Sequence, residues 1–190
     1  MIFAPGDTVP RLALPTLEDM KPEQRAVYAQ TVAGRRGSVP ANVMVWLRSP
    51  DLAARAQKLG ELVRFDTTLK PRLSELAILV VARRWRTQYE WAVHATEARK
   101  AGLRDEIVEA IRTASTPAFS EPAERVVYDF TSAVVADGRV GDELYRTAVV
   151  ELGERAVVEL VTLIGYYTMV AFTLNVFDIP APGGVRPLDG

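Results

Sequence analysis

The sequence contains no cysteine and one histidine, His94, among its 190 residues. Without cysteine the chain cannot form disulfides, use a thiol nucleophile or bind a metal ion through thiolates. A single histidine also excludes a metal site made of several histidines within one chain. Acid–base chemistry near neutral pH is therefore expected to depend on His94, because imidazole titrates in this range. We expect neither a metal ion nor a cofactor.

The chain also lacks an excess of charge of either sign. It has 23 lysines and arginines against 24 aspartates and glutamates, a formal net charge of −1. This balance gives no general reason to expect binding to nucleic acid or to an anionic membrane surface. Hydrophobic residues make up 48% of the chain, which excludes disorder for most of it and suits one domain with a real core.

A basic leader followed by an apolar run is missing from residues 1–6, so no signal peptide is predicted. Residues 160–177 carry no formal charge and reach the lower length limit of a membrane-spanning helix. They include several polar side chains and are flanked by Glu159 and Asp178. We therefore expect a buried core or subunit-interface helix there, with two buried strands as the alternative. We also expect the protein to be cytoplasmic.

The twelve prolines divide the chain into three parts. Prolines recur every few positions in residues 1–21, which predicts an extended N-terminal arm on the body or on a neighbouring subunit. The stretches 72–116 and 123–179 have no proline and are long enough for pairs of helices. We predict a single all-helical domain over residues 22–179 and an irregular tail over residues 180–190.

Start and stop signals for helices recur throughout the predicted domain. The segment 71–85 is apolar on nearly every side and must be deeply buried if it is helical. The chain as a whole is predicted to be all-α. The expected helices are 22–33, 50–65, 71–85, 88–101, 104–113, 122–136, 142–151 and 154–177.

The residues best suited to chemistry lie between positions 72 and 102. Glu90 and His94 are four residues apart, so they share one face of a helix. A carboxylate beside an imidazole favours its charged form and fixes its orientation, and such a pair can move a proton. Alternatively, Thr87 and Glu90 form a capping box at the start of the helix, and His94 is a structural residue.

Other polar residues have two interpretations each. Glu75 interrupts an apolar helix, which is costly unless the carboxylate pairs with an arginine or belongs to a functional site. The basic run 83–86 suits ion pairing at a helix C-terminus or a clamp for a substrate carboxylate. Tyr166 and Tyr167 suit core or interface positions, unless a hydroxyl reaches a pocket.

Around these residues the sequence resembles the carboxymuconolactone decarboxylase family, which includes the alkylhydroperoxidase D-like proteins. The likeness extends from Met20 to Phe177. It is densest over residues 72–79, over Tyr89-Glu90-Trp91-x-x-His94, and over residues 101–103. The resemblance implies an all-α, alkylhydroperoxidase D-like helical bundle. It also implies trimers or hexamers with sites at or near the subunit interfaces.

The redox branch of that family carries the pattern Glu-x11-Cys-x2-Cys-x3-His. Counted from Glu75, its cysteine positions are Thr87 and Glu90, and its histidine is His94. Both thiols are absent, so a thiol-dependent peroxidase would have no nucleophile. The decarboxylase branch carries Glu-x3-His, which Glu90 and His94 match, and the resemblance implies action on a carboxylated lactone without a cofactor.

These observations favour a cofactor-independent acid–base enzyme that acts on a small carboxylated or lactone substrate. In this hypothesis His94 transfers the proton, Glu90 orients and charges it, and Glu75 is a second carboxylate. Tyr89 donates a hydrogen bond to developing oxyanion charge. The alternatives are an alkylhydroperoxidase-like antioxidant protein that has lost its cysteines and a non-catalytic protein. In each case we expect a homo-oligomer, trimeric or hexameric, without nucleic-acid or membrane partners.

Overall fold

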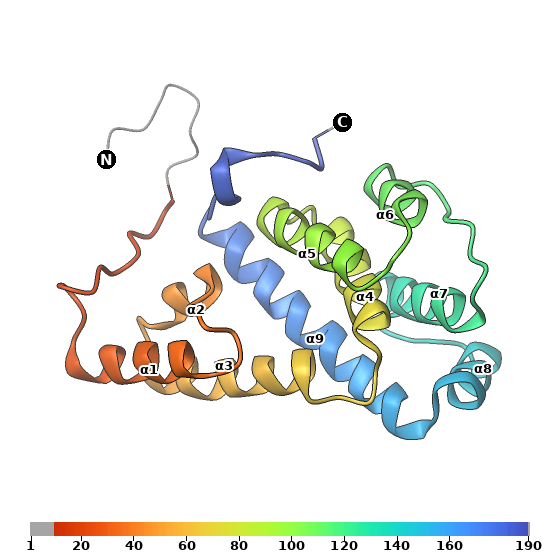
Figure 1. Ribbon diagram of the computed structural model, residues 1–190, viewed down its shortest axis with the longest axis horizontal. Helices are drawn as coiled ribbons and strands as arrows, with labels where there is room; N and C mark the ends of the chain where they lie inside the picture. Colours follow the sequence, from red (N-terminus) through yellow and green to blue (C-terminus); the bar gives the residue numbers. More distant parts are fainter. Residues whose placement is uncertain (1–9, 190) are drawn as a thin grey trace.

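The computed structural model describes residues 10–189, which form nine α-helices, one short 3-10 helix and no strand (Figure 1). The all-α class is therefore confirmed, and the apolar stretch after Glu159 is one helix rather than two strands. The elements are α1 Pro22–Ala33, α2 Ala41–Trp46, α3 Pro50–Phe65, α4 Pro71–Arg84, α5 Gln88–Lys100, α6 Asp105–Arg112, α7 Pro122–Asp137, α8 Asp142–Leu152, α9 Glu154–Val176 and η1 Pro182–Gly184.

Proline marks the first turn of four helices, α1, α3, α4 and α7. It is suited to that position because the first amides of a helix have no partner within it. Gly138 ends α7 with a φ of 70°, a backbone conformation that favours glycine. These local signals explain why eight helices begin and end within about two residues of their predicted limits. The six-residue α2 was not predicted, since so short a segment shows no helical period.

Helix α4 lies at the centre of the bundle. It packs against α5, α7 and α9, and ten of its fourteen residues are buried. Leu76, Ile78 and Leu79 have no exposed surface. A helix that is apolar on nearly every side is stable only where other helices cover all of it, and this is the position that α4 occupies.

The 23-residue α9 runs through the middle of the molecule between α3 and α4 (Figure 1). Among residues 10–189 it is the only helix long and apolar enough to cross a membrane by length and composition. Half of its most apolar window is buried against the rest of the protein. Core helices of soluble proteins meet the same criteria, so this finding is weak support for a membrane span.

The described part of the predicted arm contains no helix, and it begins beside the end of α9 before it leads to α1 (Figure 1). The backbone amide of Arg11 donates to the carbonyl of Phe177 at 2.9 Å, and its guanidinium pairs with Asp178 at 2.5 Å. Arg48 donates a hydrogen bond to the carbonyl of Ala13. Residues 1–9 of the predicted arm and residue 190 of the predicted tail lie outside the described residues.

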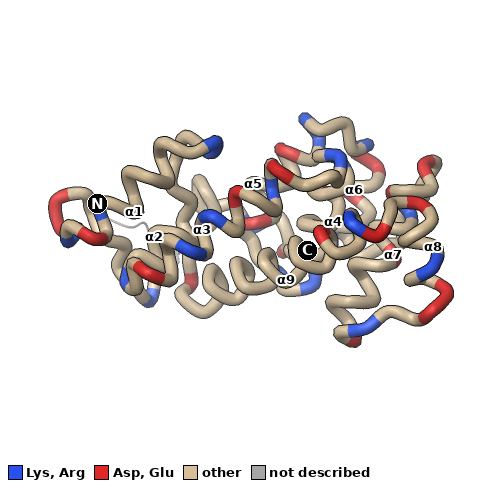
Figure 2. The backbone as a smooth tube through the Cα atoms, turned by 90° about the horizontal axis from the view of Figure 1, so that it is seen from below, with Lys and Arg blue, Asp and Glu red and all other residues tan. Residues whose placement is uncertain are grey.

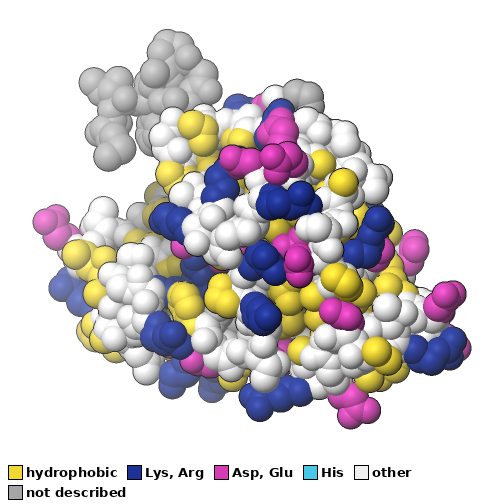
Figure 3. Space-filling view, turned by 45° about the vertical axis from the view of Figure 1, so that its right-hand side comes forward, with side chains coloured by type: hydrophobic (Ala, Val, Ile, Leu, Met, Phe, Trp, Pro, Cys, Tyr) yellow, Lys and Arg dark blue, Asp and Glu magenta, His cyan; other side chains and the backbone are white. Residues whose placement is uncertain are grey.

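Charged residues of both signs are interspersed over most of the described backbone, except along the uncharged stretch of α9 (Figure 2). On the face shown in Figure 3, hydrophobic side chains form small groups that charged side chains separate. This pattern agrees with the net charge of −1, and the face in Figure 3 has no broad area of one sign.

Two helical glycines provide a matched test of the packing around α9. A Cβ at Gly60 would lie 2.0 Å from the Tyr166 hydroxyl, whereas a Cβ at Gly165 would meet nothing within 4 Å. Gly60→Ala should therefore lose about 1–3 kcal/mol of unfolding free energy through overpacking. Gly165→Ala should gain about 0.5–1 kcal/mol, because alanine favours a helix. Urea unfolding measures both, and equal stabilities would contradict the packing of Tyr166 against α3.

Candidate active site

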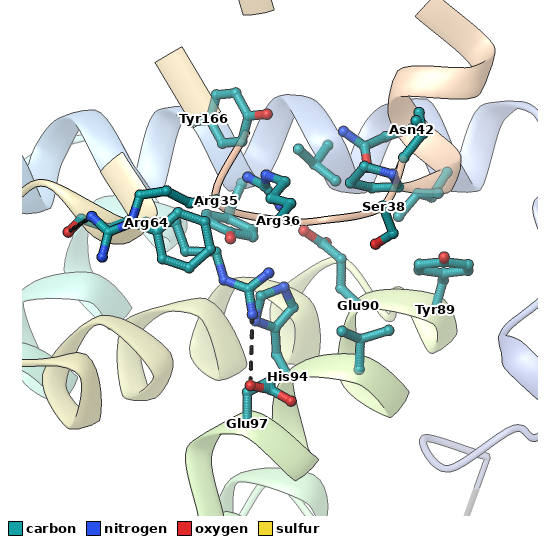
Figure 4. A pocket seen from close by; sticks show the side chains of 17 residues that line it. Arg35, Arg36, Ser38, Asn42, Arg64, Tyr89, Glu90, His94, Glu97 and Tyr166 are labelled. Carbon is teal, nitrogen blue, oxygen red and sulfur yellow. Dashed lines mark hydrogen bonds and ion pairs between the residues drawn. The ribbon is translucent and has the colours of Figure 1, made fainter. Parts of the chain in front are cut away.

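A cavity of about 460 Å³ opens where the loop before α2, the end of α3, α5 and α9 meet (Figure 4). Its lining mixes arginines, aromatic rings and three of the four sequence-predicted catalytic residues, Tyr89, Glu90 and His94. The lining residues are Arg35, Arg36, Ser38, Val39, Pro40, Asn42, Arg64, Phe65, Tyr89, Glu90, Val93, His94, Glu97, Tyr166, Tyr167, Val170 and Leu174.

The side chain of His94 contacts a carboxylate of the neighbouring helix α4. Its Nδ1 lies 2.7 Å from Oε2 of Glu75 on α4, and both side chains are almost entirely buried. The ring of Tyr167 meets the imidazole edge-on at 5.0 Å between ring centres. When Nδ1 carries the ring proton, it donates a hydrogen bond to Glu75. Nε2 then keeps its lone pair and can accept a hydrogen bond or a proton from a bound molecule. The arrangement is that of an oriented general base.

The role predicted for Glu90 beside His94 is corrected by this geometry. The carboxylate bonded to His94 is Glu75, 19 residues away in sequence, while Glu90 forms no hydrogen bond with any described residue. Residues four apart share a helix face, yet each side chain turns toward its own neighbours. The imidazole bonds to α4, and the Glu90 carboxyl points toward the loop that carries Arg36 and Ser38 (Figure 4).

The capping interpretation of Glu90 is also wrong. Thr87 is the N-cap residue of α5, but no side chain caps this helix, and the Thr87 hydroxyl has no hydrogen-bond partner among the described residues. Glu90 is 2% exposed. Burial raises the pKa of Glu90 well above its usual range, and the nearby Thr87 hydroxyl offsets only part of that effect. A neutral carboxyl, able to donate a hydrogen bond, is therefore favoured at this position.

Arg64 connects the acidic groups on one side of the cavity. Its guanidinium lies 3.8 Å from Oε1 of Glu75 and 3.9 Å from Oε2 of Glu97, the latter contact drawn in Figure 4. A hydrogen bond from Lys100 lowers the pKa of Glu97, which keeps this carboxylate charged. Glu75 therefore has both kinds of partner that its place in an apolar helix predicted, an arginine and a candidate catalytic group.

Three arginines surround the ring of Phe65 at the end of α3. The guanidinium carbons of Arg35, Arg36 and Arg64 lie 5.2–5.7 Å from the ring centre, within the range of cation–π attraction. Sequence reasoning missed this cluster. Its signal was the basic pair that follows Gly34, but nothing in the pattern indicated that this loop would meet α5.

The basic run over residues 83–86 lies elsewhere. Arg84 donates a hydrogen bond to the carbonyl of Val135 and lies over the ring of Trp85, and Arg86 is 4.0 Å from Asp189. None of residues 83–86 lines the cavity. These contacts favour the structural interpretation of the run over a clamp for a substrate in this cavity.

Three tyrosines line the cavity as well. Tyr89 is partly buried, Tyr166 is almost fully buried, and the hydroxyl of Tyr167 has no hydrogen-bond partner in the described residues. Burial raises the pKa of Tyr166 to about 12 and also raises that of Tyr167. Tyr166 and Tyr167 can thus serve as neutral hydrogen-bond donors. The donor role of Tyr89 stays a prediction.

Because the carboxyl of Glu90 is buried, we predict that it makes the stability of the folded protein depend on pH. Its pKa is raised in the folded state, so the folded protein holds this proton where the unfolded chain has already lost it. Stability contributed by Glu90 is therefore complete below its ordinary pKa of 4.5 and falls as pH rises above that value. Glu90→Gln should melt at a higher temperature than the wild type at pH 7, and the gain should vanish near pH 4.

The matched control for this measurement is Glu109→Gln. Glu109 is a surface residue bonded to Arg112, and that contact lowers its pKa. Its replacement should not stabilise the protein at pH 7. An unchanged or lower melting temperature for Glu90→Gln at pH 7 would contradict a neutral Glu90.

Comparison with known protein families gives one match. Residues 50–133 match the carboxymuconolactone decarboxylase family. This segment runs from the start of α3 into α7 and includes Glu75, Tyr89, Glu90 and His94. The part of the cavity made by the loop before α2 and by α9 lies outside it. No curated protein compared with the chain gave a significant match.

Several solved structures share the fold. The debrominase Bmp8 without ligand aligns over 92% of this chain and 94% of its own, with a TM-score of 0.71 and 18% identity. A cysteine-to-alanine variant of it, in complex with 2,3,4-tribromopyrrole, aligns over 96% and 97%, with a TM-score of 0.73 and 17% identity.

A protein of unknown function from Agrobacterium tumefaciens, provisionally assigned to antioxidant defence as AhpD, is also similar. It aligns over 72% of this chain and 94% of its own, with a TM-score of 0.64 and 18% identity. At these identities the likeness establishes the fold and leaves the chemistry to be argued from the site.

Proposed function

Since the chain belongs, through residues 50–133, to the carboxymuconolactone decarboxylase family, we propose that it is a cofactor-independent acid–base enzyme. Its substrate is a small carboxylated or lactone compound. The observation that carries the proposal is the buried bond between His94 Nδ1 and Glu75 Oε2 behind an open cavity. A buried imidazole and carboxylate at 2.7 Å are the parts that proton transfer requires.

In the proposed reaction His94 is the group that moves the proton. Glu75 accepts the Nδ1 hydrogen bond, which holds the ring in one orientation. The negative charge of Glu75 stabilises the imidazolium, from which Nε2 gives a proton to the carbon that loses carbon dioxide. In an isomerisation the imidazolium forms when Nε2 takes a proton from one substrate atom, and the proton is then returned to another. Tyr89, on the cavity wall, donates a hydrogen bond to the oxygen on which negative charge develops.

The geometry favours this proposal over a non-catalytic protein. A purely structural His94 would be expected to lie in a closed or filled site. Instead, His94 and Glu90 line a cavity of about 460 Å³, large enough for a small organic molecule. The structure of a similar debrominase contains a small ring compound, 2,3,4-tribromopyrrole, in complex with the protein. This supports a ligand of similar size for the present cavity.

A thiol-dependent antioxidant activity is disfavoured by composition. The chain has no cysteine, and Thr87 and Glu90 occupy the positions at which the redox branch carries its two thiols. Peroxide reduction by thiol exchange needs a thiolate that attacks and a second thiol that resolves the product.

The proposal is tested on carboxylated lactones, by carbon dioxide release and by solvent deuterium incorporation followed with NMR. His94→Ala should lower turnover by about 10²- to 10⁴-fold, the usual share of a general base. Glu75→Gln should lower kcat by about tenfold or more, with a smaller effect on KM, because it disturbs the base rather than the binding surface. Unchanged turnover in both variants would overturn the assignment.

Glu124→Gln is the matched control. Glu124 is also a buried carboxyl, 2% exposed, but it pairs with Arg72 at 3.0 Å and does not line the cavity. Its replacement should lower the melting temperature while turnover per folded molecule stays constant. A loss of turnover in all three variants would indicate that instability, rather than lost chemistry, explains the result.

We also propose that the protein is a cytoplasmic homo-oligomer, a trimer or hexamer. Support comes from an apolar row on the outer face of α9. Its members are spaced three, four or eleven residues apart, so they follow the helical period. Val158, Val161, Phe172 and Val176 are 67%, 47%, 47% and 56% exposed. A second copy of the chain is the occupant that we propose for this row.

The oligomer is tested by Val161→Glu. A charge placed in an apolar interface should dissociate the assembly to monomers without loss of helix content. Light scattering coupled to size-exclusion chromatography, with circular dichroism, measures both effects. The exposed Glu151→Gln, outside this row, should leave the mass unchanged. A monomeric wild type at micromolar concentration would overturn the proposal.

A further inference from the structure

The cavity presents two polar groups that the His94–Glu75 pair does not use. Arg36 lies on the loop between α1 and α2, and Glu90 lies on α5 (Figure 4). They belong to different walls of one cavity, so a single small molecule can contact both.

Arg36 is a cation without a carboxylate. Within residues 10–189 no acidic oxygen lies at ion-pair distance from it, although Arg35 pairs with Asp66 at 2.5 Å and Arg64 contacts two glutamates. One Nη2 hydrogen bond, to the carbonyl of Gly60 at 2.9 Å, and the ring of Phe65 hold the guanidinium in place. A fixed guanidinium with donors left over matches a ligand carboxylate.

Glu90 is a buried carboxyl that forms no well-aligned hydrogen bond within the described residues, and the Thr87 hydroxyl is a polar neighbour close enough to lower its pKa. Both of its oxygens are buried and lack a hydrogen bond to the described residues, and the side chain is 2% exposed. Buried polar groups are normally paired, because leaving one unpaired costs free energy. Neither oxygen has appreciable accessible surface in this conformation, so a small rotation of the side chain would bring the carboxyl to a ligand oxygen in the cavity, the acceptor that the protein does not provide.

We propose that Arg36 and Glu90 form a two-point receptor for a small organic anion. Arg36 binds the ligand's carboxylate, and the neutral Glu90 carboxyl donates a hydrogen bond to a carbonyl oxygen at the ligand's other end. The inference rests on the proposed function and deepens it, since His94 lies one turn further along α5 and lines the same cavity. The two residues thereby determine which substrates fit.

Ligand binding then depends on the proton of Glu90. Its loss removes the donor and places a negative charge against the carbonyl oxygen. The other titratable or charged groups around the cavity come from every wall. They are Arg35 and Arg36 on the loop, Arg64 on α3, Glu75 on α4, Tyr89, His94 and Glu97 on α5, and Tyr166 and Tyr167 on α9.

Three isosteric probes separate the two contacts. 4-Acetylbenzoate has both a carboxylate and a carbonyl oxygen, 4-isopropenylbenzoate replaces the carbonyl oxygen with carbon, and 4-acetylbenzamide replaces the carboxylate with a neutral amide. Titration calorimetry at pH 7 should show that 4-acetylbenzoate binds about tenfold or more tightly than either analogue.

Variants assign each preference to its residue. Arg36→Gln should lose the preference for carboxylate over amide, whereas Arg139→Gln, the matched control at an exposed arginine outside the cavity, should retain it. Glu90→Leu should lose only the preference for the carbonyl oxygen and should keep the preference for the carboxylate. Glu90→Gln should keep the preference for the carbonyl oxygen, because its amide donates, and should keep its affinity as the pH rises, whereas the wild type weakens once Glu90 loses its proton. Circular dichroism checks that each variant is folded.

Two outcomes would overturn the receptor. One is that no probe binds the folded wild type at millimolar concentration, and the other is that all three bind equally. The calorimetric experiment reads no turnover, so its failure is separate from failure of the acid–base proposal. Selective binding without turnover of any lactone would leave the receptor in place and count against the proposed enzyme.

Discussion

The hydrogen bond between His94 on α5 and Glu75 on α4 is the interaction on which the site depends. It places a carboxylate inside the most buried helix of the bundle, where an unpaired charge would be costly. Arg64 from α3 supplies a second, longer contact to the same carboxylate. Three helices are therefore tied to one polar centre, and the imidazole that results is both oriented by the core and open to the cavity.

The polar groups that line the cavity around this centre differ in charge and in their partners, because their surroundings differ. Arg64 and Glu97 are charged and pair with each other, while Arg36 is charged and has no acidic partner among the described residues. Glu90, which is fully buried, is favoured in its neutral form. A proton acceptor, a neutral donor and a free cation thus lie within one cavity of about 460 Å³. This combination suits an anionic substrate whose reacting end carries a carbonyl oxygen.

The sequence predicted the helices well because their limits are set by local chemistry. Proline in the first turn and glycine at the end act within a few residues, and eight of the nine described helices carry such signals or a clear apolar pattern. The sequence also singled out Glu75, Tyr89, Glu90 and His94. It did not show which carboxylate would bond the imidazole, because spacing along one helix contains no information on a neighbouring helix.

The sequence by itself determined the all-α class, the absence of thiol chemistry and the identity of the only imidazole. Each follows from composition or from residues close together in the chain. Tertiary structure alone decided that Glu75 bonds His94, that Glu90 is left unpartnered, and that Arg36 reaches the same cavity. Those facts depend on how α4, α5 and the loop before α2 pack, and packing brings together groups that are far apart in sequence.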